Sequence, residues 1–164
     1  MKVYVDMDGV LADFFAEMAK MSKYPVAHWK EMDQRSIFRV LEEIKGTDFF
    51  LTLPKYPQTN TLLQSIINIA GGFSILSSPI VGDEEHVTKM KNLWIEKNIM
   101  FDVDEVIITH DKAAYAKGNV LIDDFHENIH KWEAAGGFGI KWQANEQPLS
   151  DVLIPLSVLY KSQQ

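Results

Sequence analysis

Residues 2–10, KVYVDMDGV, decide how the rest of the chain is interpreted. An apolar run typical of a buried strand ends in two carboxylates, Asp6 and Asp8, two residues apart. Residues i and i+2 of an extended chain point to the same side, so the two like charges lie close together unless a cation sits between them. The stretch is therefore either a solvated strand end or a site.

Length, charge and cysteine content limit the possible classes of protein. The 164 residues suffice for one well-buried core, and the net charge of −7 argues against a broad nucleic-acid or anionic-membrane surface. The absence of cysteine excludes disulfides and thiolate metal ligands. Apolar runs fall well short of the roughly 18 residues of a membrane span. No leader pattern precedes Asp6, and we expect a soluble, cytoplasmic protein.

Short apolar runs alternate with longer helical patterns along the chain. The apolar runs are residues 2–5, 73–76, 105–109, 119–122 and 138–142, and helical spacing covers 59–72, 82–98 and 124–137. This alternation predicts an α/β fold with a parallel sheet covered on both faces, whose strands all end at one ligand-binding edge. Residues 14–60 do not fit the alternation. We expect them to form a small helical cap inserted after the first strand, within a single domain spanning 1–164.

Polar residues follow four of the expected strands at that edge: Asp6 and Asp8, then Ser77 and Ser78, then His110, Asp111 and Lys112, then Asp123 and Asp124. Mg²⁺ prefers oxygen ligands, so carboxylates from two strands, a carbonyl and a phosphate oxygen form a natural site. One carboxylate can attack phosphorus in line, while a second protonates the leaving oxygen and later activates water. Ser77 and Lys112 would then hold the transferring phosphoryl oxygens.

Four motifs in this order resemble those of a known superfamily. DMDGVLADF (6–14), ILSSPI (75–80), ITHDK (108–112) and VLIDD (120–124) are similar to the motifs of the haloacid dehalogenase-like (HAD) phosphatases, and most closely to those of the 5′(3′)-deoxyribonucleotidases. The resemblance implies a Rossmann-like, three-layer fold with the first strand in the centre, flanked by the strands that carry Ser77 and Asp123.

The resemblance also implies roles for individual residues. Asp6 matches the nucleophile and Asp8 the general acid/base, while Ser77 and Lys112 match the remaining catalytic positions. Mg²⁺ would be held by the Asp6 side chain, the Asp8 backbone carbonyl and Asp123. The chain departs from the family pattern at Ser77, His110 and Phe125, where threonine, arginine and a basic residue are common.

Some of these assignments have competitors within the chain. Lys117 is an alternative to Lys112, although the ITHDK match favours Lys112. Of Asp123 and Asp124, one is expected to bind metal while the other caps the following helix and accepts hydrogen bonds from its amides.

Residues 126–130, HENIH, satisfy the zinc-protease pattern His-Glu-x-x-His. The longer form of that pattern needs a glycine where this chain has Glu133 and a third histidine where it has Gly136. We therefore interpret His126 and His130 as ordinary residues of the helix after the fourth strand, one near the mouth of the site and one on the surface.

The substrate is expected to be a nucleoside monophosphate. The segment between the first two motifs contributes several aromatic residues, Phe14, Phe15, Trp29, Phe49 and Phe50, and Ile80 follows the serine pair. A nucleotide base stacks on such groups, and apolar groups near the sugar disfavour a ribose hydroxyl. We therefore predict hydrolysis of deoxyribonucleoside 5′-monophosphates, pyrimidines first. The predicted substrate-binding residues are Ser78, Phe14, Phe49, Phe50, Ile80 and Asp124.

Other functions remain compatible with the sequence. A related phosphatase could act on a sugar phosphate or on a nucleic-acid 3′-phosphate, although no Lys/Arg-rich run suggests a polynucleotide track. A phosphate-binding module that has lost its chemistry is a third alternative, against which all the catalytic positions are filled. A homodimer is one possible assembly.

Overall fold

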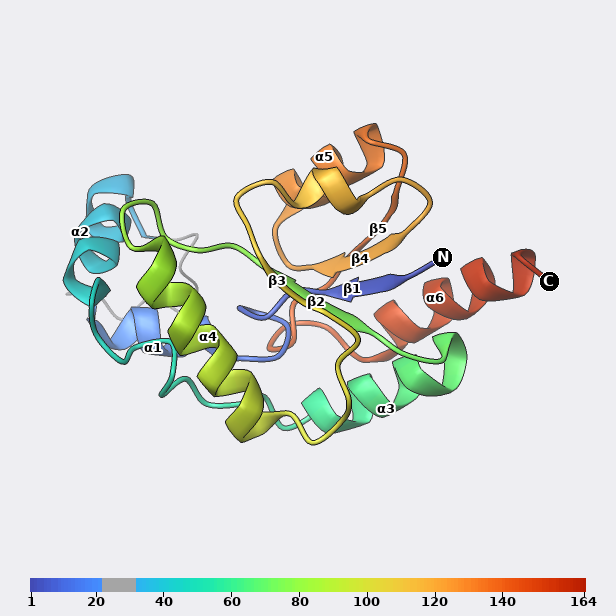
Figure 1. The fold of residues 1–164 in the computed structure, drawn as a ribbon, viewed down its shortest axis with the longest axis horizontal. Coiled ribbons are helices and arrows are strands. Elements are labelled where there is room, and N and C mark those ends of the chain that lie inside the picture. Colours follow the sequence, from blue (N-terminus) through green and yellow to red (C-terminus); the bar gives the residue numbers. More distant parts are fainter. Residues whose placement is uncertain (22–31) are drawn as a thin grey trace.

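The computed structural model describes residues 1–21 and 32–164. A five-stranded parallel sheet forms its centre, with strand order β3-β2-β1-β4-β5 (Figure 1). The strands are β1 (Val3–Val5), β2 (Ser74–Ser77), β3 (Val106–Ile108), β4 (Val120–Asp123) and β5 (Phe138–Lys141). The first strand is central and lies between those that carry Ser77 and Asp123. The predicted fold class and strand order are therefore confirmed.

Alternate residues of β1 pack into two separate apolar clusters, one on each face of the sheet. Val3 and Val5 join the larger cluster, and Tyr4 joins the smaller one. The larger cluster includes side chains of α3 (Thr59–Ala70), α4 (Glu84–Asn98) and α6 (Ser150–Ser162). The smaller cluster includes side chains of α5 (His126–Ala134), which covers the opposite face in Figure 1. This is the three-layer arrangement that the alternating pattern predicts.

Helices α3 and α5 both end close to a glycine, as the Gly-Gly pairs in the sequence predict. Helix α3 stops at Gly71, whose φ of +87° lies in the left-handed region, and the Gly71 amide donates to the carbonyl of Ile67. Helix α5 ends just before Gly136, which has a φ of +90°. A 3₁₀ turn, η2 (Lys112–Tyr115), follows β3 and positions Lys112.

Among the described residues, two helices lie in the region predicted to form a cap. They are α1 (Phe14–Met21) and α2 (Gln34–Ile44), and both appear at one end of the molecule beside α4 (Figure 1). Asp33 caps the start of helix α2, and its carboxylate accepts hydrogen bonds from the Ser36 amide and hydroxyl. Residues 22–31, including Trp29, lie outside the described residues. The division of the chain into one domain and a cap at 14–60 stays a prediction.

The last helix, α6, was not expected from the sequence pattern. Pro155 lies inside it and removes one backbone donor, and apolar residues occur on several of its sides. Val152 and Leu156 are buried, whereas Ile154 and Val158 are exposed. Helix α6 packs against α3 and β5 and thereby completes one layer of the fold.

Candidate active site

The loop after β1 turns sharply and brings the first motif against the end of β4. The amides of Leu11 and Ala12 both donate to the carbonyl of Met7. Gly9 has a φ of +81°, and a Cβ atom there would lie 2.8 Å from Cγ of Asp124. Only glycine combines this backbone conformation with such a close approach. The sequence DMDG therefore closes a turn that places Asp6 and Asp8 beside the acidic pair after β4.

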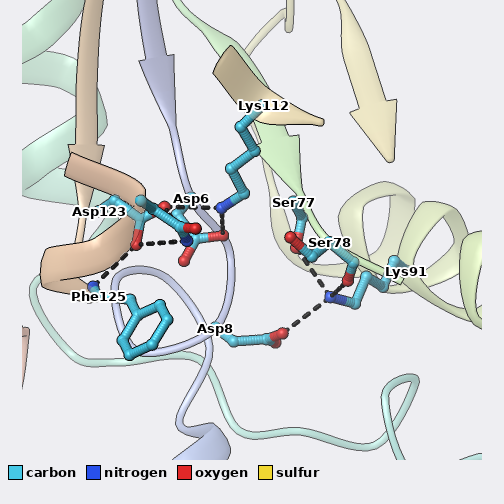
Figure 2. Close-up of polar contacts among 9 residues, drawn as sticks. Asp6, Asp8, Ser77, Ser78, Lys91, Lys112, Asp123 and Phe125 are labelled. Carbon is cyan, nitrogen blue, oxygen red and sulfur yellow. Dashed lines mark hydrogen bonds and ion pairs between the residues drawn. The ribbon is translucent and has the colours of Figure 1, made fainter. Parts of the chain in front are cut away.

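Lys112 joins the nucleophile position to the late acidic motif. Its Nζ donates to Oδ1 of Asp6 at 2.9 Å and to Oδ2 of Asp123 at 2.7 Å, and all three side chains are buried (Figure 2). Asp123 is further held by the Phe125 amide at 2.9 Å and by the Asn128 side chain. Lys112, which the sequence favoured over Lys117, therefore lies between two of the predicted site acids, and its catalytic role stays a prediction.

Three buried carboxylates meet at this point. One oxygen each from Asp6, Asp123 and Asp124 lies within 4.8 Å of the others. Burial and the neighbouring Asp6 carboxylate raise the pKa of Asp123, and the same two causes, together with Asp123, raise the pKa of Asp124 well above its usual value. Burial opposes the charged form of Lys112, but Asp123 and Asp6 outweigh it and raise the pKa of the ammonium group. One lysine thus faces three acids.

This donor set fits a hard divalent cation. The three groups offer only oxygen atoms, and their negative charge exceeds the positive charge of Lys112. The raised pKa values show the cost of keeping these acids ionised without more positive charge. The side chain of Asp8 points away from the three, toward α4, so Asp8 could contribute to a metal site only through its backbone, as the family resemblance implies.

A second buried lysine, Lys91 of α4, was not identified from the sequence. Its Nζ donates to Oδ2 of Asp8, to Oγ of Ser77 and to the carbonyl of Ser78, each at 2.8 Å (Figure 2). Lysines on helices are usually exposed, so sequence reasoning had no reason to select it. The available signal is its spacing, because Lys91 lies on the buried stripe of α4 with Val87 and Trp94.

A cavity of about 590 Å³ opens above these carboxylates. Its polar lining includes Asp6, Asp8, Lys112 and Asp124. Most of the remaining lining is apolar and comes from α1, α2 and the segment after β2: Phe14, Phe15, Met18, Ile37, Phe38, Leu41, Pro79, Ile80 and Val81. The site therefore joins a strongly acidic floor to an apolar chamber, as pockets for amphipathic small molecules commonly do.

Most of the predicted substrate-binding residues line this cavity. They are Ser78, Phe14, Phe50, Ile80 and Asp124. Phe49 is not among the lining residues; it packs edge-on against Phe14 and Phe50, at centroid distances of 6.0 and 5.3 Å. Ser77 is fully buried and also outside the lining, so Ser78 is the serine that faces the cavity.

The HENIH stretch forms the first turn and a half of α5. His126, Glu127 and His130 are all exposed. Within residues 1–21 and 32–164, the only group of three metal-binding side chains is Asp6, Asp123 and Asp124. The interpretation of the two histidines as ordinary helix residues stays a prediction.

Comparison with solved structures identifies a protein of the same fold. A HAD-superfamily hydrolase from Ehrlichia chaffeensis superposes with a TM-score of 0.55 over 96% of each chain, at 15% sequence identity. Identity at this level shows a shared fold. None of the helices in the described part of the chain is long and apolar enough to span a membrane.

Sequence comparison defines the family. The family model for 5′ nucleotidase, deoxy (Pyrimidine), cytosolic type C protein matches residues 1–146, and the chain belongs to this family. A Bordetella pertussis protein provisionally named a 5′(3′)-deoxyribonucleotidase is 29% identical over 140 residues, which cover 76% of this chain and 74% of the relative. The human 5′(3′)-deoxyribonucleotidase, cytosolic type, is 28% identical over 143 residues, 75% of this chain and 70% of the relative. The chain is thus a phosphoric monoester hydrolase of the HAD type.

Proposed function

We propose that the protein is a Mg²⁺-dependent deoxyribonucleotidase that hydrolyses nucleoside monophosphates through an aspartyl-phosphate on Asp6. The observation that supports this most strongly is the meeting of Asp6, Lys112 and Asp123 from three strand ends, beside a cavity that Asp6 and Lys112 line. A buried carboxylate fixed by a lysine can be aimed at an incoming phosphorus atom.

Each residue of the site then has a distinct task. Asp6 attacks phosphorus through one carboxylate oxygen while the bond to the leaving oxygen breaks. Asp8 donates a proton to that leaving oxygen, and in the second step it takes a proton from the water that hydrolyses the aspartyl-phosphate. Lys112 and Ser78 supply positive charge and a hydrogen-bond donor next to the phosphoryl oxygens, and Ser77 supports the turn behind them.

Asp6, Asp123 and Asp124 are the side chains that would hold the cation, with the Asp8 carbonyl as a further ligand. When bound, Mg²⁺ would offset the negative charge of the carboxylates and the phosphate. Asp123 accepts hydrogen bonds from Lys112, the Phe125 amide and Asn128, whereas Asp124 lines the cavity, so both acids remain candidates for direct contact.

The apolar chamber favours a nucleotide over a sugar phosphate. Phe14, Phe50 and Ile80 line the cavity and offer flat or branched apolar surface to a base. Base stacking on an aromatic side chain contributes about 1–3 kcal/mol. A ribose 2′-hydroxyl without a polar partner would cost roughly 1–3 kcal/mol, which disfavours ribonucleotides by about tenfold or more.

A panel of nucleoside monophosphates, deoxy and ribo, assayed for phosphate release with and without Mg²⁺, tests this function. We expect dUMP and dTMP to be turned over with the highest kcat/KM, purine deoxynucleotides less well and ribonucleotides least. Comparable kcat/KM for UMP and dUMP would contradict the substrate assignment and leave only the phosphatase class. No turnover of any phosphate ester would instead favour a binding module.

Better hydrolysis of a sugar phosphate or of an oligonucleotide 3′-phosphate would support one of the alternative phosphatase functions. The cytoplasmic location and a homodimeric assembly belong to the same proposal. Size-exclusion chromatography with light scattering would test the assembly directly.

A further inference from the structure

Lys91 is a fully buried cation whose three ammonium hydrogens all have acceptors within the fold. Oδ2 of Asp8, Oγ of Ser77 and the carbonyl oxygen of Ser78 each lie 2.8 Å from its Nζ. Burying an ammonium group is costly unless it is paired and hydrogen-bonded. The chain meets this requirement with one carboxylate and two neutral oxygens, so Lys91 and Asp8 form a pair that is balanced in charge.

Lys91 is separated from the substrate space. It is not among the residues that line the cavity, whereas the Phe50 ring lines it and has its centroid 4.7 Å from Nζ of Lys91. Phe50 thus lies against the ammonium group, at a distance typical of a cation–π contact. Contact between Lys91 and a phosphate in the cavity would require its present bonds to break, and a direct role on substrate is therefore disfavoured.

The two oxygens of Asp8 have different environments. Oδ2 is held by Lys91, while Oδ1 is buried and, within the described residues, has no hydrogen-bond partner. Asp8 itself lines the cavity. A carboxylate with one oxygen fixed by Lys91 has a defined orientation, and the other oxygen makes no hydrogen bond within the described residues that would compete for that orientation.

We propose that Lys91 is a positioning residue that holds the Asp8 carboxylate in place for proton transfer, an inference that rests on the proposed function. The cycle starts with Asp8 protonated by a proton taken up from solvent. As the bond between Asp6 and phosphorus forms and the bond to the leaving oxygen breaks, that proton moves to the leaving oxygen and leaves the ionised carboxylate that pairs with Lys91. In the second step a water oxygen bonds to phosphorus and the bond to Asp6 breaks, while one proton of the water moves to Asp8 and the other stays with the released phosphate. Lys91 neither gains nor loses a proton in either step. It affects both steps because it holds Asp8 in place.

This role has a consequence that depends on the leaving group. A nucleoside alkoxide is a poor leaving group and needs the proton, whereas 4-nitrophenolate leaves readily without one. Loss of a correctly placed Asp8 should therefore harm nucleotide cleavage far more than aryl phosphate cleavage. Because kcat/KM reports the steps up to cleavage of the ester, it is the parameter to compare.

The experiment compares Lys91→Met with Lys89→Met, an exposed lysine on the same helix. We expect Lys91→Met to lower kcat/KM for dUMP about 10²-fold, with a fall at least tenfold smaller for 4-nitrophenyl phosphate. Lys89→Met should leave both values unchanged. Equal falls for the two substrates would overturn the positioning role, because general damage to the site does not discriminate between leaving groups.

A double mutant keeps the test valid if Lys91→Met folds poorly. Asp8→Asn with Lys91→Met removes both charges of the buried pair, so no unpaired ion is left. If Lys91 acts through Asp8, the double mutant and Asp8→Asn should have the same kcat/KM for dUMP. A further tenfold loss in the double mutant would show that Lys91 acts independently of Asp8. If the wild-type protein hydrolysed neither dUMP nor 4-nitrophenyl phosphate, the result would instead contradict the proposed function itself.

Discussion

The two buried lysines of the site serve the two aspartates of the first motif in different ways. Lys112 contacts Asp6 and Asp123 and lies in a group of three carboxylates, so that group carries a surplus of negative charge. Lys91 contacts a single carboxylate, that of Asp8, and its pair is neutral. Figure 2 shows the two groups side by side, each centred on its own ammonium group. The first group therefore has an excess of negative charge that a further cation could offset, whereas the charges of the second are balanced.

The difference explains how two carboxylates two residues apart avoid repelling each other. Each carboxylate side chain is paired with its own lysine, whereas the sequence alone suggests a single cation between the two. Asp6 turns toward β4 and Asp8 turns toward α4, so each finds a separate lysine from a different element. The same short motif thus supplies one carboxylate in an anionic environment and one in a neutral environment; under the proposed function these are the nucleophile and the acid/base.

The largest expected effect distinguishes the two aspartates. Asp6→Asn should lower turnover by about 10⁴-fold or more, because an amide does not attack phosphorus. Asp8→Asn should lower it about 10²- to 10⁴-fold and allow phosphorylated enzyme to accumulate, since release of phosphate needs the base. Rapid quench with ³²P-labelled dUMP measures both quantities. The mechanism would be contradicted if Asp6→Asn released phosphate at the wild-type rate, or if the protein of that variant became labelled.

The next effect tests the anionic group alone. Activity should vanish with a chelator and return with Mg²⁺, and Asp123→Ala should raise the Mg²⁺ concentration needed for half-maximal activity about 10- to 100-fold. His126→Ala and His130→Ala serve as matched controls and should leave the Mg²⁺ dependence unchanged. If zinc alone restored activity, and either histidine substitution abolished that recovery, the metal site would have to be assigned to α5.

A smaller effect concerns the aromatic wall beside the neutral pair. Phe50→Leu should raise KM for dUMP about 5- to 100-fold through loss of stacking, while KM for 4-nitrophenyl phosphate changes little. Phe49→Leu should have a weaker effect, because Phe49 supports the wall from behind. Steady-state kinetics on both substrates provide the comparison. A larger effect at Phe49 than at Phe50 would show that the base lies elsewhere.

The smallest effect is on the free energy of unfolding. It has opposite signs for a substitution in the acidic group around Lys112 and for one in the Lys91–Asp8 pair. Burial and like charge raise the pKa of Asp124, so its ionised form destabilises the folded state at any pH above the unfolded value. Asp124→Asn should therefore stabilise the metal-free protein at pH 8 by about 1 kcal/mol, or roughly 2–4 °C in Tm. Asp8→Asn leaves Lys91 without its counter-ion and should destabilise the protein by about 1–3 kcal/mol.

Thermal unfolding in the presence of a chelator measures both shifts. Added Mg²⁺ should raise the Tm of the wild type, because a ligand that binds only the folded state stabilises that state. The rise should be smaller for Asp124→Asn, which has lost one of the proposed ligands. A fall in Tm for both variants of similar size would show that the two groups do not differ in charge balance.

The sequence predicts the sheet and its functional edge well, because both depend on local features. Short apolar runs set the five strands, and the polar residues that follow them lie together once parallel strands end at one edge. Lys112 could be predicted because it follows such a strand within a recognisable motif. The haloacid dehalogenase-like resemblance then placed Asp6 and Asp123 beside it.

Features that depend on the packing of distant segments could not be predicted in this way. Lys91 lies in the middle of a helix, and only the fold shows that its helix face meets Asp8. Helix α6 contains Pro155 and lacks a clear polar face, so its pattern does not resemble a surface helix. The different positions of Phe49 and Phe50 follow from how the segment before Pro54 passes the cavity, which composition does not specify.

Gly9 gives the site a fixed width. Its missing side chain lets the turn after β1 touch the Asp124 carboxyl group, at a point where even a methyl group would come within 2.8 Å. The distance between the first motif and the acids at the end of β4 is thus limited by direct contact between the turn at Gly9 and the Asp124 side chain. Under the proposed function a phosphoryl group reacts between these closely spaced groups. Restricting their separation would favour catalysis, because small displacements of reacting groups lower the reaction rate.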